Sequence, residues 1–405
     1  MRAPVKSHVT LAIAVCCAWG LTLGCGGGGS SSQNASQAPI PTSGQNVQPI
    51  VVNTGPVGNY ANGAFTSVTV CVPGSSTCQT ISGVLVDIGS VGLRILSSSL
   101  TLTLPQQKAP SGDPVAECLP FLDSYTWGPV ESADVEMSGE KASAVPIQVL
   151  SDTDFSVPSG CTDFGLQSAD TLQALGANGL LGVGMYAQDC GGGCAQSGSY
   201  GLYYECPSSG CQPITEPLSA QVQNPVALFA TDNNGVVIEL PAVNGSEATL
   251  SGSLIFGIGT ESNNGLGSAT VYTLNSDAGI TTEFNGQSYP NSFLDSGSNG
   301  LYFLDSAATS IPDCGDLTYF YCPANVENLS ATNTGGNAAS AAISFSVANA
   351  DNLFNSDPND AVFSQLAGPN PDSFDWGLPF FYGRDVFTAI QNAATPGGTG
   401  PYWAY

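Results

Sequence analysis

The sequence predicts an all-β chain built from two homologous lobes with a cleft between them. Residues 85–96 can be laid over residues 293–304 without a gap, and six of the twelve aligned positions are identical. The 49 glycines and 27 prolines among 405 residues favour short strands joined by turns. A chain of this length can also bury two separate cores. We therefore expect a duplicated β-fold in which each half presents one of the two matching segments.

Each matching segment is an apolar strand that runs directly into an acidic loop. Asp87 follows an apolar pair in the first half, and Asp295 follows one in the second. Both loops continue with a glycine and a serine, which are Gly89 and Ser90 in the first loop and Gly297 and Ser298 in the second. Because glycine lets two loops approach closely, we expect the two aspartates to meet at the seam between the lobes.

The charge balance excludes nucleic acid as a partner. The chain carries 32 acidic and 6 basic residues, for a net charge of −26. Two of the basic residues, Arg2 and Lys6, lie at the extreme N-terminus. Such a surface cannot neutralise a phosphate backbone. Few ion pairs would suit an acidic medium, although an acidic surface can equally serve only to keep an exported protein soluble.

Histidine is nearly absent, which limits the chemistry. The one histidine, His8, lies inside the apparent signal peptide. Without it, a Ser/His/Asp triad, a Cys/His pair and a histidine-ligated zinc site are excluded. Any hydrolysis must therefore rest on carboxylates and hydroxyls, and we expect no cofactor and no metal.

The N-terminus reads as an export signal followed by a linker. Residues 1–25 resemble a bacterial lipoprotein signal peptide that ends at Cys25, where we expect a lipid anchor; simple secretion is the alternative. Residues 26–48 have the composition of a flexible tether. The two lobes would then span residues 49–224 and 225–405, and no later segment has the pattern of a membrane span. We expect the protein in the cell envelope, on the outer membrane or facing the periplasm.

Ten cysteines follow Cys25, and their even number in an exported chain predicts disulfide bonds. The local spacing indicates Cys71–Cys78, Cys118–Cys161 and Cys314–Cys322. Four more would form two nested pairs, and a metal site is the rival interpretation for them: Cys190, Cys194, Cys206 and Cys211.

The first half reads as strands and hairpins. A hairpin with its turn at residues 73–76 ends in a strand over residues 79–86, which delivers Asp87. A second hairpin spans residues 119–151 and turns at Gly139. Residues 179–184 predict a tight buried strand that needs close backbone approach. Residues 185–223 read as a Gly/Ser/Cys-rich excursion.

The second half repeats this order. Strands are expected over residues 251–257 and 269–274, and residues 281–289 lead to Asp295. Residues 324–341 read as a polar loop, followed by a strand over residues 342–347. A last apolar segment, residues 376–383, precedes a short helix with one apolar face, formed by Val386, Phe387 and Ile390.

These motifs resemble the pepsin-like aspartic proteases, whose two lobes each carry an Asp-Thr/Ser-Gly-Thr/Ser loop. Residues 87–90 and 295–298 match the two loops. Residues 180–182 and 381–387 resemble the two apolar-apolar-Gly strands that thread beneath them. The chain is also similar to an uncharacterised family of bacterial lipoproteins with the same paired loops. The resemblance covers residues 60–395.

The resemblance implies a bilobal pepsin-like acid protease fold and an exported, monomeric endopeptidase. Asp87 and Asp295 would share one proton and activate a water to hydrolyse a peptide or protein substrate. Gly89, Ser90, Ser296, Gly297 and Ser298 would support the two loops. On the hairpin that closes over the substrate, Phe121 aligns by spacing and Tyr125 is the nearest hydroxyl.

One position departs from the family pattern. Ile88 stands where the family has a hydroxyl that bonds across to the opposite loop, whereas Ser296 can still make that bond. Activity would be weakened, and the alternative is a weak or inactive pepsin-like lipoprotein that binds a partner in the envelope. A glycosidase or other carboxylate hydrolase, and aspartates that are merely turn residues, are further alternatives. Trp127 and Trp376 are expected in the core, and Arg94 and Arg384 in structural or surface pairs.

Overall fold

The computed structural model describes residues 40–405, apart from residues 152–154 and 163–164. The signal peptide, Cys25 and most of the predicted tether therefore lie outside the described residues. Strands dominate the described part and its helices are short, so the prediction of a bilobal all-β fold is confirmed. Among the described residues, no helix has the length and apolar character needed to cross a membrane.

The described part of the first half contains eleven strands. They are β1 (Val47–Asn53), β2 (Gly63–Cys71), β3 (Cys78–Asp87), β4 (Val91–Leu96), β5 (Val115–Pro120), β6 (Ser124–Met137), β7 (Glu140–Leu150), β8 (Gln167–Ser168), β9 (Gly179–Val183), β10 (Tyr203–Glu205) and β11 (Gln212–Pro213). The helical turns are η1 (Ser97–Ser99), α1 (Ser159–Thr162), α2 (Leu172–Leu175), α3 (Gly192–Gln196), η2 (Gly198–Tyr200) and η3 (Pro225–Leu228).

The second half contains sixteen strands. They are β12 (Gly235–Leu240), β13 (Ser246–Glu247), β14 (Leu250–Phe256), β15 (Val271–Thr273), β16 (Ile280–Phe284), β17 (Gln287–Leu294), β18 (Leu301–Leu304), β19 (Glu327–Thr334), β20 (Ser340–Val347), β21 (Val362–Phe363), β22 (Ala367–Gly368), β23 (Asn370–Trp376), β24 (Arg384–Ala389), β25 (Ala394–Thr395), β26 (Gly398–Thr399) and β27 (Tyr402–Ala404). The helical turns are α4 (Ser306–Thr309), α5 (Ala350–Ser356) and η4 (Leu378–Phe380).

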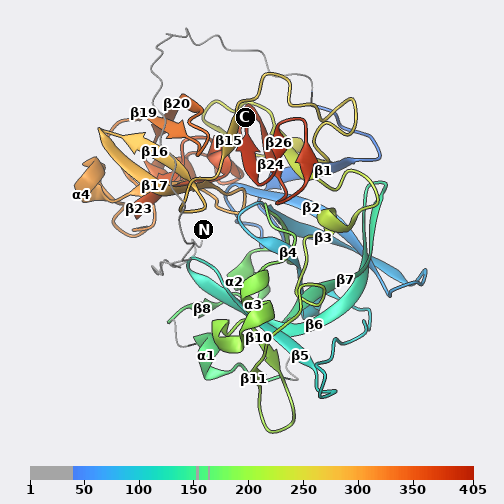
Figure 1. The fold of residues 1–405 in the computed structure, drawn as a ribbon. Helices are drawn as coiled ribbons and strands as arrows, with labels where there is room; N and C mark the ends of the chain where they lie inside the picture. Colours follow the sequence, from blue (N-terminus) through green and yellow to red (C-terminus); the bar gives the residue numbers. More distant parts are fainter. Residues whose placement is uncertain (1–39, 152–154, 163–164) are drawn as a thin grey trace.

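One continuous sheet joins the two halves through β1. This strand pairs antiparallel with β2 on one edge and with β14 on the other. Beyond β14 the sheet continues through β12, β24, β27 and β15. Figure 1 shows β1 in blue close to the red C-terminal strands, while the orange strands β16 to β20 belong to the second lobe. Because β1 begins at Val47, the last two residues of the predicted tether belong to this sheet.

In each half, a later strand is inserted beside the strand that carries the aspartate. In the first lobe β9 runs parallel to β3, with Gly182 opposite Asp87, and antiparallel to β4. In the second lobe β23 runs parallel to β17, with Trp376 opposite Leu294, and antiparallel to β18. The glycine that follows, Gly377, therefore takes the place that Gly182 has in the first lobe.

The prediction for the second threading strand and its helix is wrong. The threading strand ends at Trp376, and residues 381–383 come after it, beyond η4. The residues expected as a helix form β24, which pairs with β12 and β27 in the shared sheet. All residues of β24 from Val386 onward are buried. An apolar run buried on both faces has no period that separates a strand from a helix.

The polar stretch of residues 324–341 is also not a loop, because it contains β19 and the start of β20. Its inward positions are small or polar: Ala331 is buried, and so is Asn333, which accepts a hydrogen bond from the Thr282 hydroxyl at 2.8 Å. A strand whose inward side chains are neither large nor apolar gives little alternation in the sequence.

The cysteines between residues 40 and 405, where the structure describes them, form five disulfide bonds. Three are the bonds that spacing indicated, Cys71–Cys78, Cys118–Cys161 and Cys314–Cys322. The nested arrangement of the other four cysteines is wrong, because neighbours in sequence pair as Cys190–Cys194 and Cys206–Cys211. These bonds take up the four sulfur atoms that the rival metal site would need. Five disulfides indicate an extracellular or periplasmic protein.

Arg94 is fully buried and links the strand after the first acidic loop to two other segments. Its Nη2 lies 3.0 Å from Oε1 of Glu117 on β5 and 2.9 Å from Oδ2 of Asp189. Its Nη1 donates to the carbonyl of Val91 at 2.5 Å. Burial raises the pKa of Glu117 well above its usual range, Asp189 raises it further, and Arg94 acts in the opposite direction. One cation is therefore shared by two carboxyl groups. The two tryptophans expected in the core, Trp127 and Trp376, are both buried.

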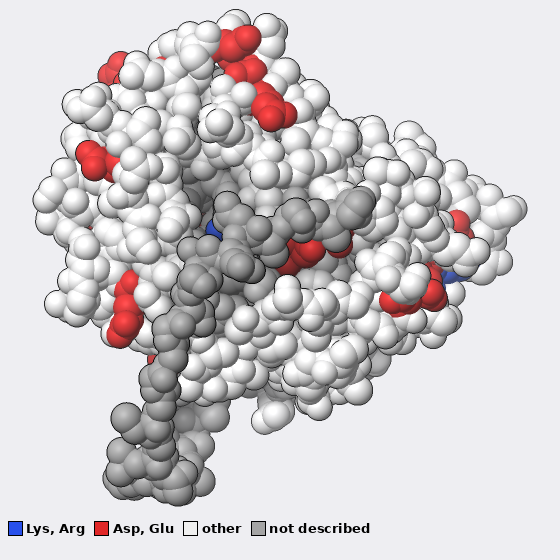
Figure 2. Space-filling view, turned by 90° about the horizontal axis from the view of Figure 1, so that it is seen from above, with Lys and Arg blue, Asp and Glu red and all other residues white. Residues whose placement is uncertain are grey.

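Acidic groups far outnumber basic groups in this chain. Figure 2 shows acidic side chains as separate patches on a mainly uncharged face, with little basic surface nearby. In the shared sheet, Glu239 on β12 lies opposite Asp385 on β24. Burial raises the pKa of Glu239 to about 7, and the charge of Asp385 adds to the effect. The folded protein therefore holds this carboxyl in its protonated form up to near-neutral pH.

We predict that Glu239→Gln raises the Tm at pH 7.5 and leaves it nearly unchanged at pH 4. The folded pKa of about 7 lies above the ordinary value of 4.5, so the protonated carboxyl stabilises the fold fully below pH 4.5. This stability is lost as the pH rises through 7, and glutamine avoids the loss. Allowing for solvent screening, we expect a gain of about 1 kcal/mol, measured by calorimetry. The exposed Glu327→Gln is the control. An equal gain at both pH values would contradict the account.

Candidate active site

Asp87 and Asp295 face each other across the seam between the two lobes. Asp87 ends β3, and Asp295 directly follows β17. A Cβ atom built at Gly89 would lie 2.6 Å from Cγ of Asp295, and one built at Gly297 would lie 2.8 Å from Oδ1 of Asp87. No side chain fits at either position, so this close approach of the two loops requires glycine. The structure thus brings together the two aspartates that the sequence singled out.

In the first loop, two donors hold the carboxyl of Asp87. The backbone N–H of Gly89 donates to its Oδ1 at 2.6 Å, and the hydroxyl of Ser90 donates to its Oδ2. Burial raises the pKa of Asp87 well above its usual range, and the charge and hydrogen bond of Asp295 raise it further. The two donors act in the opposite direction. The balance leaves Asp87 protonated under conditions where an isolated aspartate is ionised.

The second loop repeats this arrangement around Asp295. The backbone N–H of Gly297 donates to Oδ1 of Asp295 at 2.8 Å, and the hydroxyl of Ser298 donates to Oδ2 at 3.0 Å. Donors to a carboxylate favour its charged form. The same residue types at the same spacing therefore give the same carboxyl orientation in both loops.

A third carboxyl group, that of Asp375, is connected to this pair. Asp375 is buried on β23 opposite Phe293, and its Oδ2 lies 2.6 Å from the hydroxyl of Ser298. The hydroxyl of Ser298 has one proton, so it cannot donate to Asp295 and Asp375 at once. In the first lobe the matching position on β9 is Leu180. Sequence reasoning missed Asp375 because it placed the second threading strand six residues too late, at the glycine Gly383 and not Gly377.

The side chain of Ser296 in the second loop forms hydrogen bonds to the first loop, and Ile88 of the first loop makes no matching bond in return; we call this one-sided contact the clasp. The hydroxyl of Ser296 accepts the backbone N–H of Ile88 at 3.0 Å and donates to the carbonyl of Val86 at 3.0 Å. Ser296 is fully buried, so these bonds are shielded from water. Ile88 cannot return them and instead belongs to the large apolar core. The hydroxyl missing at position 88 is thus replaced by apolar packing.

Of the two residues considered for the hairpin over the site, the structure places Phe121 near it and Tyr125 away from it. β5 and β6 form a hairpin whose tip is closed by a hydrogen bond from the N–H of Phe121 to the carbonyl of Ser124, at 2.7 Å. Phe121 and Tyr60 both pack against the small apolar cluster that contains Leu85 and Leu180. Tyr125 is buried in a different cluster, with Trp127 and the Cys118–Cys161 disulfide. Trp127 is two residues further along β6, so Tyr125 lies on the same face of that strand as Trp127.

Tyr60 is a site residue that sequence reasoning missed. It lies in the connection between β1 and β2 and packs edge-to-face on Phe65, with ring centroids 5.5 Å apart. Burial raises the pKa of Tyr60, and the charges of Asp123, Asp295 and Asp87 raise it further. The charges of both aspartates of the seam, and of Asp123 at the hairpin tip, therefore act on its hydroxyl. No motif marks Tyr60, since it reaches the site through the fold of the chain.

The described residues contain one group of side chains at metal-ligand spacing, Cys314, Cys322 and Asp351. Its two cysteines are joined in a disulfide, so they offer no thiolates to an ion. The chemistry available at the seam is therefore that of carboxyl groups and hydroxyls.

A family model described as "Protein of unknown function (DUF3443)" matches residues 42–405. No curated protein matches the chain. Among solved structures, an aspartic proteinase from Irpex lacteus matches with a TM-score of 0.51 and 14% sequence identity. That match covers 88% of this chain and 96% of the proteinase. The likeness shows a pepsin-like bilobal fold.

We predict that Ser296→Ala lowers the free energy of unfolding by about 2–4 kcal/mol. The variant leaves the buried N–H of Ile88 and carbonyl of Val86 without their partner, at about 1–3 kcal/mol for each unsatisfied group, reduced by local relaxation. Urea unfolding measures the change. The exposed Ser330→Ala is the matched control and should stay within about 0.5 kcal/mol of the parent. A Ser296→Ala effect as small as the control would show that the clasp does not hold the loops.

Proposed function

The chain belongs to the DUF3443 family, whose function is unknown, and we propose that it is an exported aspartic endopeptidase. Its catalytic residues would be Asp87 and Asp295, acting on a peptide or protein substrate through an activated water. The proposal rests on the geometry of the site and not on the fold alone, because one fold hosts many functions.

The observation that carries the proposal is the contact between the two carboxyl groups. Two unit charges about 3 Å apart repel by roughly 5 kcal/mol at an effective dielectric of 20, which amounts to several pKa units. The pair must therefore keep one proton between its members over a wide pH range. Glycosidases hold their two carboxyl groups about 5–9.5 Å apart, which argues against that alternative.

The shared proton provides an acid and a base at one place. With Asp87 protonated and Asp295 ionised, Asp295 takes a proton from a water held between them as that water attacks the scissile carbonyl carbon. Asp87 gives its proton to the carbonyl oxygen, which leaves a neutral gem-diol. Asp295 then gives its proton to the amide nitrogen, and Asp87 takes a proton from one hydroxyl of the gem-diol as the C–N bond breaks. The products are a carboxylic acid and an amine, and the dyad returns to its starting state.

Two aromatic residues beside the dyad support a role in holding the substrate. Phe121 at the hairpin tip and Tyr60 pack against one cluster, and the charges of both aspartates act on the Tyr60 hydroxyl. We propose that Tyr60 supplies the hydroxyl that a tyrosine on the hairpin provides elsewhere in this fold. An extended peptide bound between the hairpin and the acidic loops would then meet a hydroxyl on one side and an apolar ring on the other.

The setting of the reaction would be the cell envelope. The disulfides indicate a compartment outside the cytoplasm, and a lipid at Cys25 would hold the protein at a membrane surface. Carboxyl groups with raised pKa values, such as those of Asp87 and Glu239, stabilise the fold most in acid, which supports an acidic working pH.

The one-sided clasp favours a second candidate, a weakly active or inactive protein that binds a partner in the envelope. The bond missing from Ile88 would let the second loop shift relative to the first, and a misplaced dyad can lose catalytic rate while the fold stays intact. This candidate predicts a binding partner whose affinity survives replacement of either aspartate.

We predict that the purified protein cleaves denatured protein substrates between about pH 3 and 6 and that pepstatin inhibits it. Asp87→Asn and Asp295→Asn should each lower kcat by about 10³-fold or more, because each removes the acid or the base. The exposed Asp277→Asn is the control and should be unaffected. No cleavage by a folded parent, or cleavage that survives both replacements, would overturn the endopeptidase proposal.

We also predict that Asp375→Asn moves the acidic limb of the pH–rate profile to lower pH by about half to one unit. The variant removes a negative charge near Asp295, and its amide can donate to Ser298, whose hydroxyl proton then serves Asp295 alone. Both effects favour the singly ionised form of the Asp87/Asp295 pair over its doubly protonated form. A pH profile of kcat measures the shift. An unchanged or raised limb would show that Asp375 is not coupled to the dyad.

A further inference from the structure

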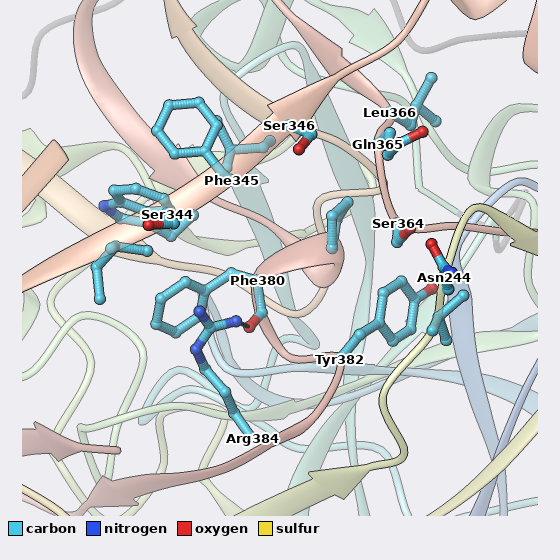
Figure 3. A pocket seen from close by; sticks show the side chains of 15 residues that line it. Asn244, Ser344, Phe345, Ser346, Ser364, Gln365, Leu366, Phe380, Tyr382 and Arg384 are labelled. Atoms are coloured by element: carbon cyan, nitrogen blue, oxygen red, sulfur yellow. Dashed lines mark hydrogen bonds between the residues drawn. The ribbon is translucent and has the colours of Figure 1, made fainter. Parts of the chain in front are cut away.

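A cavity in the second lobe lies outside the candidate active site. Its volume is about 250 Å³, and its walls come from β20, η4, β24 and the segments around residues 243–244 and 364–366. Figure 3 shows Arg384 and Phe380 on one side of it, with Ser346, Gln365 and Ser364 opposite. Leu301 and Trp376 form the wall toward the second acidic loop. The cavity is therefore separated from the dyad by packed side chains.

Arg384 brings a positive charge to this cavity without a counter-charge. The ion pairs between described residues use Arg94 and Lys141, and none includes Arg384. Its Nη1 donates to the carbonyl of Phe380 at 2.5 Å, and its guanidinium carbon lies 4.5 Å from the centre of the Phe380 ring. Desolvation lowers the pKa of Arg384, but a guanidinium stays charged in proteins. These two contacts fix the group and leave further N–H donors for a ligand.

Other polar side chains at the cavity have capacity to spare. Among the described residues, the side chains of Asn244, Ser344 and Gln365 make no hydrogen bond in the structure, although all three line the cavity. Amide and hydroxyl groups of this kind orient a ligand that a charge attracts. Phe345 and Phe380 provide apolar surface between them. The walls therefore combine one cation, several neutral polar groups and two aromatic rings.

We propose that this cavity binds a small monoanionic carboxylate, whose charged group pairs with Arg384. The planar fork of a guanidinium matches a carboxylate in a bidentate pair, and a single cation balances a single negative charge. No second basic residue lines the cavity, so a phosphate dianion would remain half neutralised. The volume is below the roughly 300–1,000 Å³ of sites for drug-sized ligands, which limits the occupant to a small molecule or one terminal residue of a peptide.

Two sources of such a carboxylate have the same chemistry, a free small acid and the C-terminus of a peptide. The proposal goes beyond the endopeptidase function and does not depend on it, because the dyad takes no part in this binding. It also gives Arg384 a role that the surface or structural pair expected from sequence does not supply, since the residue has no acidic partner among the described residues.

The test is calorimetric titration of the full exported chain carrying Asp295→Asn, so that hydrolysis cannot interfere. N-acetylglycine represents a peptide terminus, lactate represents a free acid, and N-acetylglycinamide is the uncharged control. We expect saturable one-to-one binding of at least one carboxylate, and at least tenfold weaker binding of the amide. Tighter binding of N-acetylglycine would identify a peptide terminus as the natural ligand, and tighter binding of lactate a free acid.

Variants assign the binding to the cavity. Arg384→Gln should weaken the carboxylate at least tenfold, and Arg384→Lys should restore part of the affinity. Lys108→Gln makes the same change in net charge at an exposed position and should have no effect. If Arg384→Gln fails to fold, Ser344→Leu narrows the cavity without removing a hydrogen bond and should also weaken binding. Equal affinity for acid and amide, no binding of either acid, or full affinity in both Arg384→Gln and Ser344→Leu would overturn the proposal.

Discussion

The contact between the carboxyl groups of Asp87 and Asp295 is the constraint on which the rest of the site depends. Asp295 lies against Gly89 of the first loop, and Asp87 lies against Gly297 of the second loop. A Cβ atom at either glycine would collide with the opposite aspartate. Each is held at the end of a strand by a second strand inserted beside it, β9 in one lobe and β23 in the other. The repulsion that this contact would cause is relieved by a proton, and the same proton supplies the acid for hydrolysis.

The chain has too few cations to pair with all of its buried carboxyl groups. With 32 acidic and 6 basic residues, few acids can be neutralised by an ion pair. The chain protonates several of them instead. Asp87, Glu117 and Glu239 all have raised pKa values, and burial is the largest cause in each case. Arg94 pairs with two acids in the first lobe, whereas Arg384 in the second lobe forms no ion pair with a described residue. The fold and the proposed chemistry thus favour the same acidic conditions.

Much of the fold could be predicted from the sequence because the two acidic loops repeat residue by residue. The strand before Asp87 and the hairpin around Gly139 follow from local pattern and turn chemistry. The errors arose where local pattern is ambiguous. Residues 386–389 are buried on both faces, so they show no strand period. Phe381 to Gly383 have the apolar-apolar-Gly pattern expected of the threading strand, whereas residues 375–377, which take that place, begin with an aspartate. Tyr60 and Asp375 reach the site by tertiary contacts that no spacing in the sequence reveals.

The central claim is that Asp87 and Asp295 titrate as a coupled pair, and carboxyl-carbon NMR of Asp87 across pH 2–9 tests it most directly. The account predicts that Asp87 titrates well above the usual value of about 3.9 for an aspartate. It also predicts that this value falls in Asp295→Asn, because the opposite charge is then absent. An Asp87 carboxyl that titrates near the usual value in the parent, and identically in Asp295→Asn, would contradict it.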